Sequence, residues 1–541
     1  MIRAAGIVTA ALLVLGGTAA PAAAAPGFGV RISPVANLVY HLDCLSGYRR
    51  CTRAAFDELW QRLDWNGEDE RLLARWRQLQ ERYRLYADFT TSAPDTPYPY
   101  TFPYLQARGV DIGEKLRLAS LQARDLADYG ERLRLLLQPR DAREALAIAR
   151  HFEPRFAAWW RDGAAGDLER LAAGYQGTAR RAQLDTLLGR VGSLFDLRLE
   201  DVADLEVNLV ALPEGARASR ATLIENQAIV ESRRGEAPAD RLGVIVHEFV
   251  HYLYALSPRS RHEALLAAFL ASERPWSLRA YNLINEAVAS AIGNGIVERR
   301  LQSEAEYRRY RALPDSFYAD FYVDTLAKAL VPVLDRHLGD GRPLDAAFAA
   351  DYLHTAARAL EGRLDDLALQ LVSSAVVATD PALAELAGLP ASALTTFSLF
   401  THVTAEPGLP ATALARYPEL SGIVLVRAGD LHRLAGFADE SVIELMEGLS
   451  GRLGEFVYGQ PRSPQATVYY VCGSDEAGVK KALEHLLSRS ASFTGLSLPA
   501  GTAVRYSDYS GSSDRISKRM PMARSRASKA SPIASAGVST P

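Results

Sequence analysis

Two histidines four residues apart, with a glutamate beside the first, form the pattern in this chain that most clearly suggests chemistry. They stand in the run His247-Glu248-Phe249-Val250-His251. Residues four apart lie one turn above each other on a helix, so both imidazoles would project from one face and could grip one ion. Glu248 would lie about 100° round the helix from His247, within reach of water at that ion. The pattern predicts a zinc site with His247 and His251 as ligands and Glu248 as general base.

The residues around this motif argue against a helix that merely carries two histidines. Val244, Val246 and Leu253 are among the apolar neighbours, so the helix is expected to be largely buried. Buried imidazoles and carboxylates need partners, and a metal ion would supply them. Gly243 and Ala255 continue the histidine stripe as small residues that would leave room for metal and substrate.

A catalytic zinc ion takes three protein ligands and keeps one position open, so a third ligand is needed. Glu286 lies in a second helical run, Asn282 to Ser290, that is otherwise mostly apolar. Ala289, Ser290 and Asn282 share its face, as expected for a carboxylate that points into a common cavity. We predict that Glu286 is the third ligand. The alternative is an exposed acid on an amphipathic helix.

These motifs resemble those of the gluzincin metallopeptidases, a group that includes the thermolysin-like enzymes. The resemblance rests on the run His247 to His251 and on Asn285-Glu286-Ala287, and it covers roughly residues 200–300. It implies a zincin-like catalytic domain that binds Zn²⁺ and hydrolyses peptide bonds. One position differs: thermolysin-like enzymes place an aspartate one turn after the ligand glutamate, and Ser290 stands there in this chain.

The mechanism implied by this ligand set is hydrolysis by activated water. Zinc lowers the pKa of water toward about 7 and polarises the scissile carbonyl. Glu248 would take the proton from water and deliver it to the leaving amine. Gluzincins commonly add a tyrosine or histidine that stabilises the oxyanion, and His354 is the residue we favour as that catalytic group. The competing candidates are Tyr281, Tyr318, Tyr322 and Tyr352.

A secreted zinc metallopeptidase acting on a peptide or protein is therefore the expected function. An amidase acting on cell-wall peptides is the alternative among enzymes, and a non-catalytic zinc-binding or peptide-binding protein on a zincin scaffold is the alternative outside them. Glu248 favours an enzyme, because a pure binding module needs no base. Gluzincins bind extended substrate along a sheet edge, and the resemblance suggests Thr222 to Ser232 as that edge.

The elements that must position these residues can be read from the surrounding pattern. The motif helix is expected between Asp240, a plausible N-cap, and Ser257-Pro258. The segments Leu205–Leu209 and Thr222–Ser232 are expected to be strands, separated by a turn. A long helical block is expected to run from Asp240 to about Leu386, and it would carry Glu286.

We expect a mainly helical α+β fold with a small sheet in the catalytic domain. The C-terminal region alternates short β-like runs with helix patterns and predicts a small α/β domain. Its expected strands are Phe397–Val403, Gly422–Val426, Phe456–Tyr458 and Ala466–Cys472, and its clearest helix runs from Ser474 to Leu487. The expected division is 1–25 signal peptide, 26–199 mainly helical region, 200–390 zincin-like domain, 391–505 small α/β domain and 506–541 disordered basic tail.

The first 25 residues combine a basic start, an apolar centre and a small-residue exit, which predicts a secretory signal peptide. We therefore expect a secreted or periplasmic protein with no membrane span after signal removal. A net charge of -3 on 541 residues gives no basic field for nucleic acid. Cys44 and Cys51 could form a disulfide that leaves Cys472 unpaired, or all three could be free thiols. The sequence predicts no oligomeric state.

Overall fold

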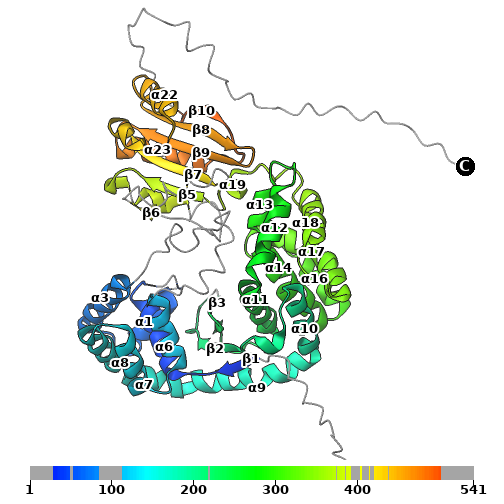
Figure 1. Ribbon diagram of the computed structural model, residues 1–541. Helices are drawn as coiled ribbons and strands as arrows, with labels where there is room; N and C mark the ends of the chain where they lie inside the picture. The colour runs from blue at the N-terminus through cyan, green and yellow to red at the C-terminus, as the bar shows by residue number, and fades with distance from the viewer. Residues whose placement is uncertain are drawn as a thin grey trace, which may run out of the picture.

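The computed structural model describes residues 28–48, 51, 53–83, 112–216, 220–372, 374–383, 385–390, 403–404, 414, 420–435, 438–500 and 502. Within them the chain is mainly helical with two separate sheets, in agreement with the predicted α+β class (Figure 1). The predicted signal peptide, the basic tail and most of the expected strand Phe397–Val403 lie outside the described residues.

The N-terminal helices form a bundle that packs on one side of the first sheet. They are α1 (Pro34–Leu45), α2 (Arg53–Gln61), α3 (Gly67–Arg82), α6 (Ile112–Gln122), α7 (Leu126–Leu136) and α8 (Pro139–Trp159). The next two helices, α9 (Ala165–Arg181) and α10 (Leu184–Leu194), pack instead with the helix that carries His247. Asn66 caps α3, since its side chain accepts a hydrogen bond from the Glu68 amide while Asp69 accepts one from the Asn66 amide. A disulfide joins Cys44 and Cys51, which confirms the first of the two cysteine arrangements.

The first sheet has the order β1-β2-β4-β3. Its strands are β1 (Phe28–Arg31), β2 (Leu205–Ala211), β3 (Ala221–Ile224) and β4 (Gln227–Ser232). β2 runs parallel to β1 and to β4, and β3 is the antiparallel edge strand. The expected single strand Thr222–Ser232 is therefore wrong: it is a hairpin that turns at Glu225, whose φ of 53° breaks the extended backbone.

This sheet lies between two apolar cores. Val207 and Leu209 of β2 belong to a core that includes the motif helix, whereas Val210, on the opposite face, belongs to the core of the N-terminal bundle. Alternate residues of a strand point to opposite faces, so one strand supplies both cores. Leu168 of α9 and Leu188 of α10 also lie in the first core, so packing crosses the boundary that we expected at residue 199.

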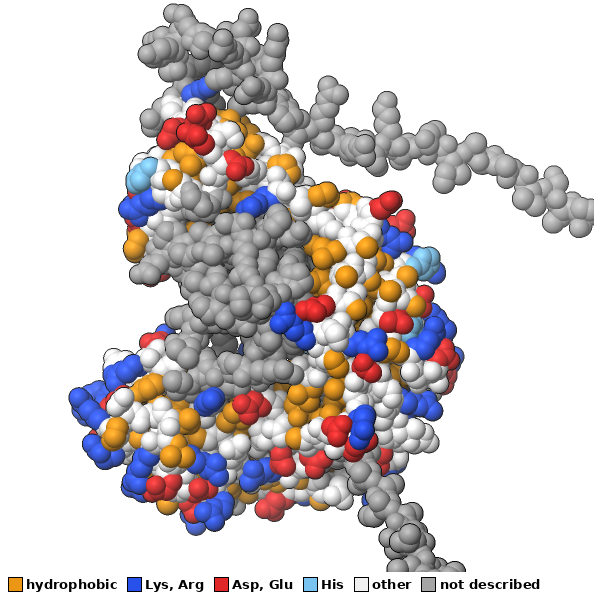
Figure 2. Space-filling model, in the orientation of Figure 1, with side chains coloured by type: hydrophobic (Ala, Val, Ile, Leu, Met, Phe, Trp, Pro, Cys, Tyr) orange, Lys and Arg blue, Asp and Glu red, His pale blue; other side chains and the backbone are white. Residues whose placement is uncertain are grey.

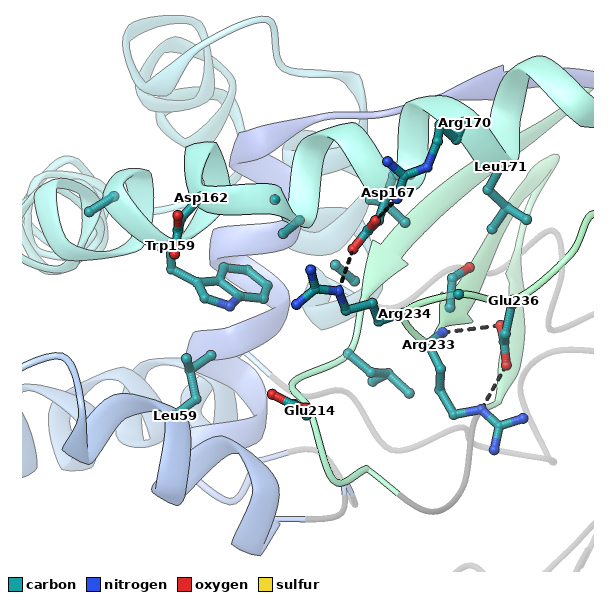
Figure 3. Close-up of a pocket in the computed structure, with 18 of the residues that line it drawn as sticks. Leu59, Trp159, Asp162, Asp167, Arg170, Leu171, Glu214, Arg233, Arg234 and Glu236 are labelled. Atoms are coloured by element: carbon teal, nitrogen blue, oxygen red, sulfur yellow. Dashed lines mark hydrogen bonds and ion pairs between the residues drawn. The ribbon is translucent and has the colours of Figure 1, made fainter.

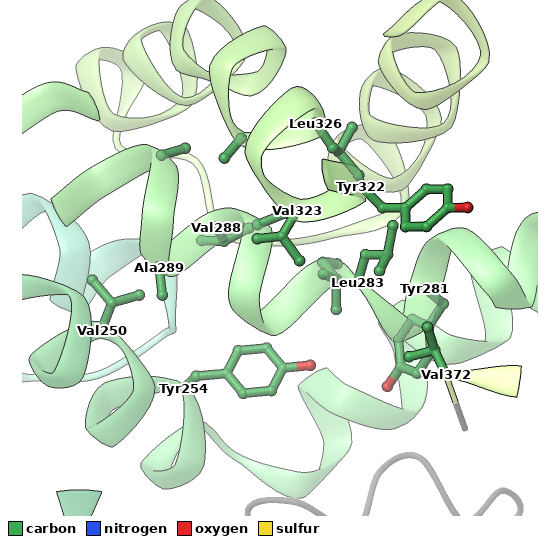
Figure 4. Close-up of a cluster of buried hydrophobic side chains, with 14 of the residues drawn as sticks. Val250, Tyr254, Tyr281, Leu283, Val288, Ala289, Tyr322, Val323, Leu326 and Val372 are labelled. Carbon is green, nitrogen blue, oxygen red and sulfur yellow. The ribbon is translucent and has the colours of Figure 1, made fainter. Parts of the chain in front are cut away.

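The lobe that carries the run His247–His251 is helical. Its elements are α11 (Ala239–Leu256), α12 (Arg259–Leu270), α13 (Ser277–Asn282), α14 (Ile284–Ser290), the π-helix η4 (Ala291–Val297), α15 (Glu298–Leu301), α16 (Glu304–Ala312), α17 (Phe321–Asp340), α18 (Ala346–Ala359) and α19 (Leu367–Leu371). Figure 4 shows Val250, Val288 and Val323 packing together from α11, α14 and α17. Asp240 is not the N-cap of α11. Pro238 holds that position, and the Asp240 carboxylate accepts a hydrogen bond from the Ala237 amide at 2.9 Å.

The C-terminal unit is built on the second sheet, in the order β10-β8-β9-β7-β5-β6. The strands are β5 (Ser374–Ala378), β6 (Val403–Thr404), β7 (Ser421–Arg427), β8 (Glu455–Ser463), β9 (Ala466–Gly473) and β10 (Gly495–Ser497), with helices α22 (Glu440–Ser450) and α23 (Glu476–Leu487). The long helical block expected up to Leu386 is wrong at β5, whose residues Val376 and Val377 favour a buried strand. This sheet thus begins before residue 391.

The surface and the helices carry two further observations. Lysine and arginine side chains are interspersed with aspartate and glutamate over the face seen in Figure 2.

Among the described residues, no helix combines the length and the apolar character needed to cross a membrane.

Candidate metal centre

The three predicted ligands meet at one point of the structure. α11 carries His247 and His251, and α14 carries Glu286, and one ligand atom from each lies within 4.8 Å of the other two. The Nε2 atoms of the two histidines are 2.9 Å apart, and each lies 3.4 Å from Oε2 of Glu286. Two helices therefore bring two nitrogens and one carboxylate oxygen together, as the spacing predicts.

This arrangement fits a small divalent cation. Ligand atoms about 2 Å from a tetrahedral ion lie about 3.3 Å from one another, which is close to the two nitrogen–oxygen separations. Oε2 of Glu286 is buried, and no described side chain donates a well-aligned hydrogen bond to it. A buried carboxylate oxygen without such a donor is costly, and an ion between the three atoms would remove that cost. The cluster could therefore hold a metal ion.

Each histidine is also held from behind by a residue of α14. Asn285 Oδ1 accepts a hydrogen bond from His251 Nδ1 at 3.0 Å, and Ser290 Oγ lies 3.4 Å from His247 Nδ1. Such contacts fix the ring orientation and the tautomer, so that both Nε2 atoms face the cluster. Ser290 thus stands behind a ligand histidine although it replaces the aspartate of thermolysin-like enzymes. One short helix supplies the third ligand and both orienting groups.

Electrostatics keep Glu286, the predicted third ligand, anionic. Burial alone would raise the pKa of Glu286, but the imidazoles of His251 and His247 hold it well below its usual range. Burial would likewise lower the pKa of His251, and the Glu286 carboxylate instead raises it to about 9. Glu248 is buried beside the cluster, and burial raises its pKa against the opposing effect of the two imidazoles. A carboxyl with a raised pKa is suited to exchange protons near neutral pH.

A glycine contact sets the distance between the two helices that carry the ligands. η4 continues directly from α14, and a methyl group placed on Gly293 would lie 2.7 Å from the backbone nitrogen of His247. Only glycine allows the two backbones to approach this closely. π-Helical turns of this kind often occur at functional sites. The chain therefore places η4 against the turn of α11 that carries the first ligand.

Tyr318 is the one of the expected oxyanion-stabilising candidates that lies at the cluster. Its ring is roughly parallel to that of His247, with 6.0 Å between centroids and 23° between planes. Burial, together with the carboxylates of Glu286 and Glu248, raises the pKa of its phenol. The hydroxyl therefore keeps its proton at neutral pH and can act as a hydrogen-bond donor.

His354, the residue favoured from the sequence, does not lie with the cluster. It is exposed on α18 and lines an outer groove with Pro332 and Arg336 of α17. Tyr352 and Leu353 occupy the inward face of the same helix, so the neighbouring position turns outward. A helical pattern alone does not tell which face of a helix is covered by another element, and this correction follows from the packing.

The remaining tyrosine candidates serve packing elsewhere. Tyr322 donates to Asp366 Oδ2 at 2.7 Å, and Tyr352 donates to the Ala280 carbonyl at 2.8 Å. Tyr281 packs edge-on against Phe269 with ring centroids 5.1 Å apart.

Of the predicted substrate edge Thr222–Ser232, only the outer strand of the hairpin, β3, lies at the edge of the sheet. β3 forms the edge of the first sheet and packs beside α11, whereas β4 is paired on both sides. An edge strand presents unpaired backbone groups that an extended chain can join. Within the described part of the chain, the unpaired edge of the hairpin is therefore Ala221–Ile224.

A cavity of about 730 Å³ lies away from the cluster, between α2, α9 and the loop that follows β4. Figure 3 shows Arg233 pairing with Glu236 and Arg234 pairing with Asp167 in this cavity. Its charges largely neutralise one another, and none of the metal-centre residues lines it. The cavity therefore indicates no particular charge in a ligand, and we assign it no role.

Comparison with known proteins places the chain in no family. No protein-family model matches the sequence, no curated protein matches it, and no solved structure matches its fold.

Proposed function

We propose that this protein is a zinc-dependent metallopeptidase whose Zn²⁺ is held by His247, His251 and Glu286. The observation that carries the proposal is the convergence of two imidazole nitrogens and one carboxylate oxygen from α11 and α14. Two nitrogens and one oxygen form the ligand set of catalytic zinc sites that leave one position open. The buried Glu248 supports an enzyme over a binding protein, because a carboxyl beside the predicted ligands is costly to bury and is the base that hydrolysis needs.

Each side chain around the proposed zinc site has a separate role in the reaction. Zinc bound there would polarise a carbonyl and make water a stronger acid near neutral pH. Glu248 accepts a proton from the attacking water and delivers it to the leaving amine. Tyr318 donates a hydrogen bond to the substrate oxygen as negative charge develops on it. The edge strand β3 beside α11 pairs with an extended peptide and aligns it.

We also propose that the enzyme acts outside the cytoplasm. The leader-like pattern of the first 25 residues supports export. The disulfide between Cys44 and Cys51 supports an oxidising compartment independently of that pattern. An amidase acting on cell-wall peptides would use the same centre and differ only in its substrate.

The test compares the parent protein with Glu248→Gln after zinc loading. Zinc content is measured by elemental analysis, and cleavage is followed on an unfolded protein and on cell-wall peptides. We expect Glu248→Gln to retain zinc and to lose about 10³-fold in kcat, because the general base is removed while the ligands remain. Glu263→Gln on α12, a glutamate in an exposed pair with Arg259, is the control that should leave both measurements unchanged.

The outcomes separate the alternatives. Cleavage of cell-wall peptides alone would support the amidase. A parent that binds one zinc ion and cleaves neither substrate would support the binding protein and reject the peptidase.

A further inference from the structure

The residue that we place over the metal centre, Tyr318, lies outside regular secondary structure. Residues 313–320 join α16 to α17 without helical backbone. Backbone groups in such a segment need partners from elsewhere in the fold, and without them the segment would be mobile. The position of Tyr318 therefore depends on the contacts that fix this connection as well as on the stacking of its ring against His247.

A buried aspartate in the first turn of α17 fixes one side of the connection. Asp324 Oδ1 accepts hydrogen bonds from the amides of Phe317 at 2.9 Å and Tyr318 at 3.4 Å. Its other oxygen, Oδ2, pairs with Lys328 Nζ at 2.7 Å, and the same ammonium donates to the Leu313 carbonyl. The side chain of Asp324 is only 8% exposed. One carboxylate thus ties the backbone of Tyr318 to α17, and Lys328 balances its charge.

The π-helix η4 fixes the other side. Asn294 Nδ2 donates to the Phe317 carbonyl at 2.6 Å. The Phe317 ring packs so closely on Gly295 that a methyl group there would lie 2.8 Å from it. Gly293, which directly precedes Asn294 in η4, contacts the backbone of His247. The connection is therefore anchored to the same element that sets the position of α11.

We propose that Asp324, with Lys328 as its counter-ion, is a positioning residue that holds the Tyr318 hydroxyl over the metal centre. The inference rests on the proposed function, since it assigns a purpose to the geometry of that site. Asp324 touches neither the cluster nor the substrate; it acts through the two backbone amides. Asn294 supports the same segment from η4.

Positioning of this kind affects catalysis because a hydrogen bond to a developing oxyanion is effective only over a narrow range of geometry. A displacement of about 1 Å at such a group can cost about 100-fold in rate. If the Asp324 carboxylate only stabilised the fold, its removal would reduce activity by lowering the amount of folded enzyme. If it acts through Tyr318, its removal lowers kcat only while the Tyr318 hydroxyl is present.

A double-mutant cycle separates these two roles. Asp324→Asn, Tyr318→Phe and the combined variant are loaded with zinc, and kcat and KM are measured on the peptide substrate that the parent cleaves. We expect Tyr318→Phe to lower kcat about 100-fold and Asp324→Asn to lower it about 10-fold, with KM within about 2-fold of the parent. The combined variant should match Tyr318→Phe alone, because the positioned hydroxyl is already gone.

Asp366→Asn is the matched control. Asp366 is also a buried aspartate that accepts a tyrosine hydroxyl, that of Tyr322, and pairs with a cation, Arg363. We expect it to leave kcat unchanged and to show no coupling to Tyr318→Phe. If the effects of Asp324→Asn and Tyr318→Phe multiply, Asp324 has no positioning role and the inference is rejected while the peptidase stands.

A second measurement needs no activity. Amide hydrogen exchange of the zinc-free protein should be about 10-fold faster in residues 313–320 of Asp324→Asn than in the parent, with α11 unchanged. If Asp324→Asn fails to fold by circular dichroism, Asn294→Ala takes its place in both measurements. Unchanged exchange in this segment overturns the inference. A zinc-loaded parent that cleaves nothing overturns the proposed function instead, and the exchange result still decides whether the anchor exists.

Discussion

The cluster around Asp69 and the candidate metal centre both combine histidine with a buried carboxylate, and they differ in how completely the carboxylate is satisfied. Between α3 and α8, Asp69 receives His151 Nε2 at 2.8 Å and two guanidinium nitrogens of Arg155 at 2.8 and 2.6 Å. It also accepts the Asn66 amide. In the metal centre, Oε2 of Glu286 lies between two imidazole nitrogens, and neither donates to it with good geometry.

The difference shows how a structural cluster can be told from a site that needs a ligand. Burial alone would raise the pKa of Asp69, but hydrogen bonds from Arg155 and His151 lower it to about 2. A permanent cation and full hydrogen bonding make that group complete without any ion. Among the described partners of Glu286 there is no arginine or lysine. Glu286 therefore has no permanent cation beside it, only two imidazoles, whereas Asp69 is paired with the guanidinium of Arg155.

The largest expected effect comes from removing the Glu286 carboxylate. Glu286→Ala should weaken zinc binding by more than about 100-fold, since loss of outer contacts alone costs 10- to 100-fold and this change removes a direct ligand. Titration with a chromophoric zinc chelator measures the affinity, and circular dichroism confirms the fold. An unchanged zinc affinity would remove Glu286 from the ligand set and with it the contrast drawn above.

Removing the Asp69 carboxylate should lower stability and leave zinc binding unchanged, which is the reverse of the result expected at Glu286. Asp69→Asn leaves Arg155 short of its counter-ion and weakens the cap of α3, so we expect the free energy of unfolding to fall by about 2 kcal/mol. Zinc affinity should not change. Because the pKa of Asp69 is lowered in the folded protein, its contribution is present above about pH 4 and is lost as the pH falls toward 2.

Urea unfolding at pH 7 checks the size of this loss. Glu58→Gln, which breaks an exposed pair with Arg62, is the control and should change stability by less than about 0.5 kcal/mol. A loss of zinc affinity in Asp69→Asn would mean that the two clusters are not independent.

Glu298 on α15 is a third largely buried carboxyl, and its substitution should give the smallest effect of the three. Unlike Asp69, it is not hydrogen-bonded to a cation. Its hydrogen-bond donor is the neutral Gln302, at 2.7 Å. Burial raises its pKa to about 7, against the effect of that hydrogen bond. A raised pKa means that the stability present below about pH 4.5 is lost as the pH rises through 7. Glu298→Gln, which carries no charge, should therefore be more stable than the parent by about 1 kcal/mol at pH 8 and equal to it at pH 4.5.

Thermal unfolding of the zinc-free protein at the two pH values provides the measurement. An equal difference at both would show that Glu298 does not titrate between them.

The part of the site that the sequence predicted is the part set by local geometry. His247, Glu248 and His251 follow from one turn of helix, and the expected end of that helix at Ser257 is confirmed. Glu286 followed from the need for a third ligand on a second apolar helix. The strands β7 and β9 were likewise visible as short apolar runs, and their bounds agree with the expected ones to within one residue. β8 contains the expected Phe456–Tyr458 but continues to Ser463.

The rest depends on contacts between distant segments. Tyr318 stands in a connection without periodicity, and Asp324 and Asn294 place it through hydrogen bonds that no local pattern encodes. A faint signal existed, since Asp320 and Asp324 are acids around the start of a helix, but it indicates a cap and not a site. His354 was favoured for its place in a helical stretch downstream of Glu286. The choice was wrong because helical periodicity does not tell which neighbouring element covers a face.

The pairing of β1 with β2 has a consequence for the order of assembly. Phe28 lies opposite Leu205, so the first strand of the sheet cannot close until a chain segment more than 170 residues long has been made. The helices α1 to α8 lie between these strands and are synthesised first, on the face of the sheet away from α11. During synthesis these helices are therefore complete before β2 emerges, and α11 and α14 are made later still. The residues proposed to bind metal come together only after more than half of the chain has been made.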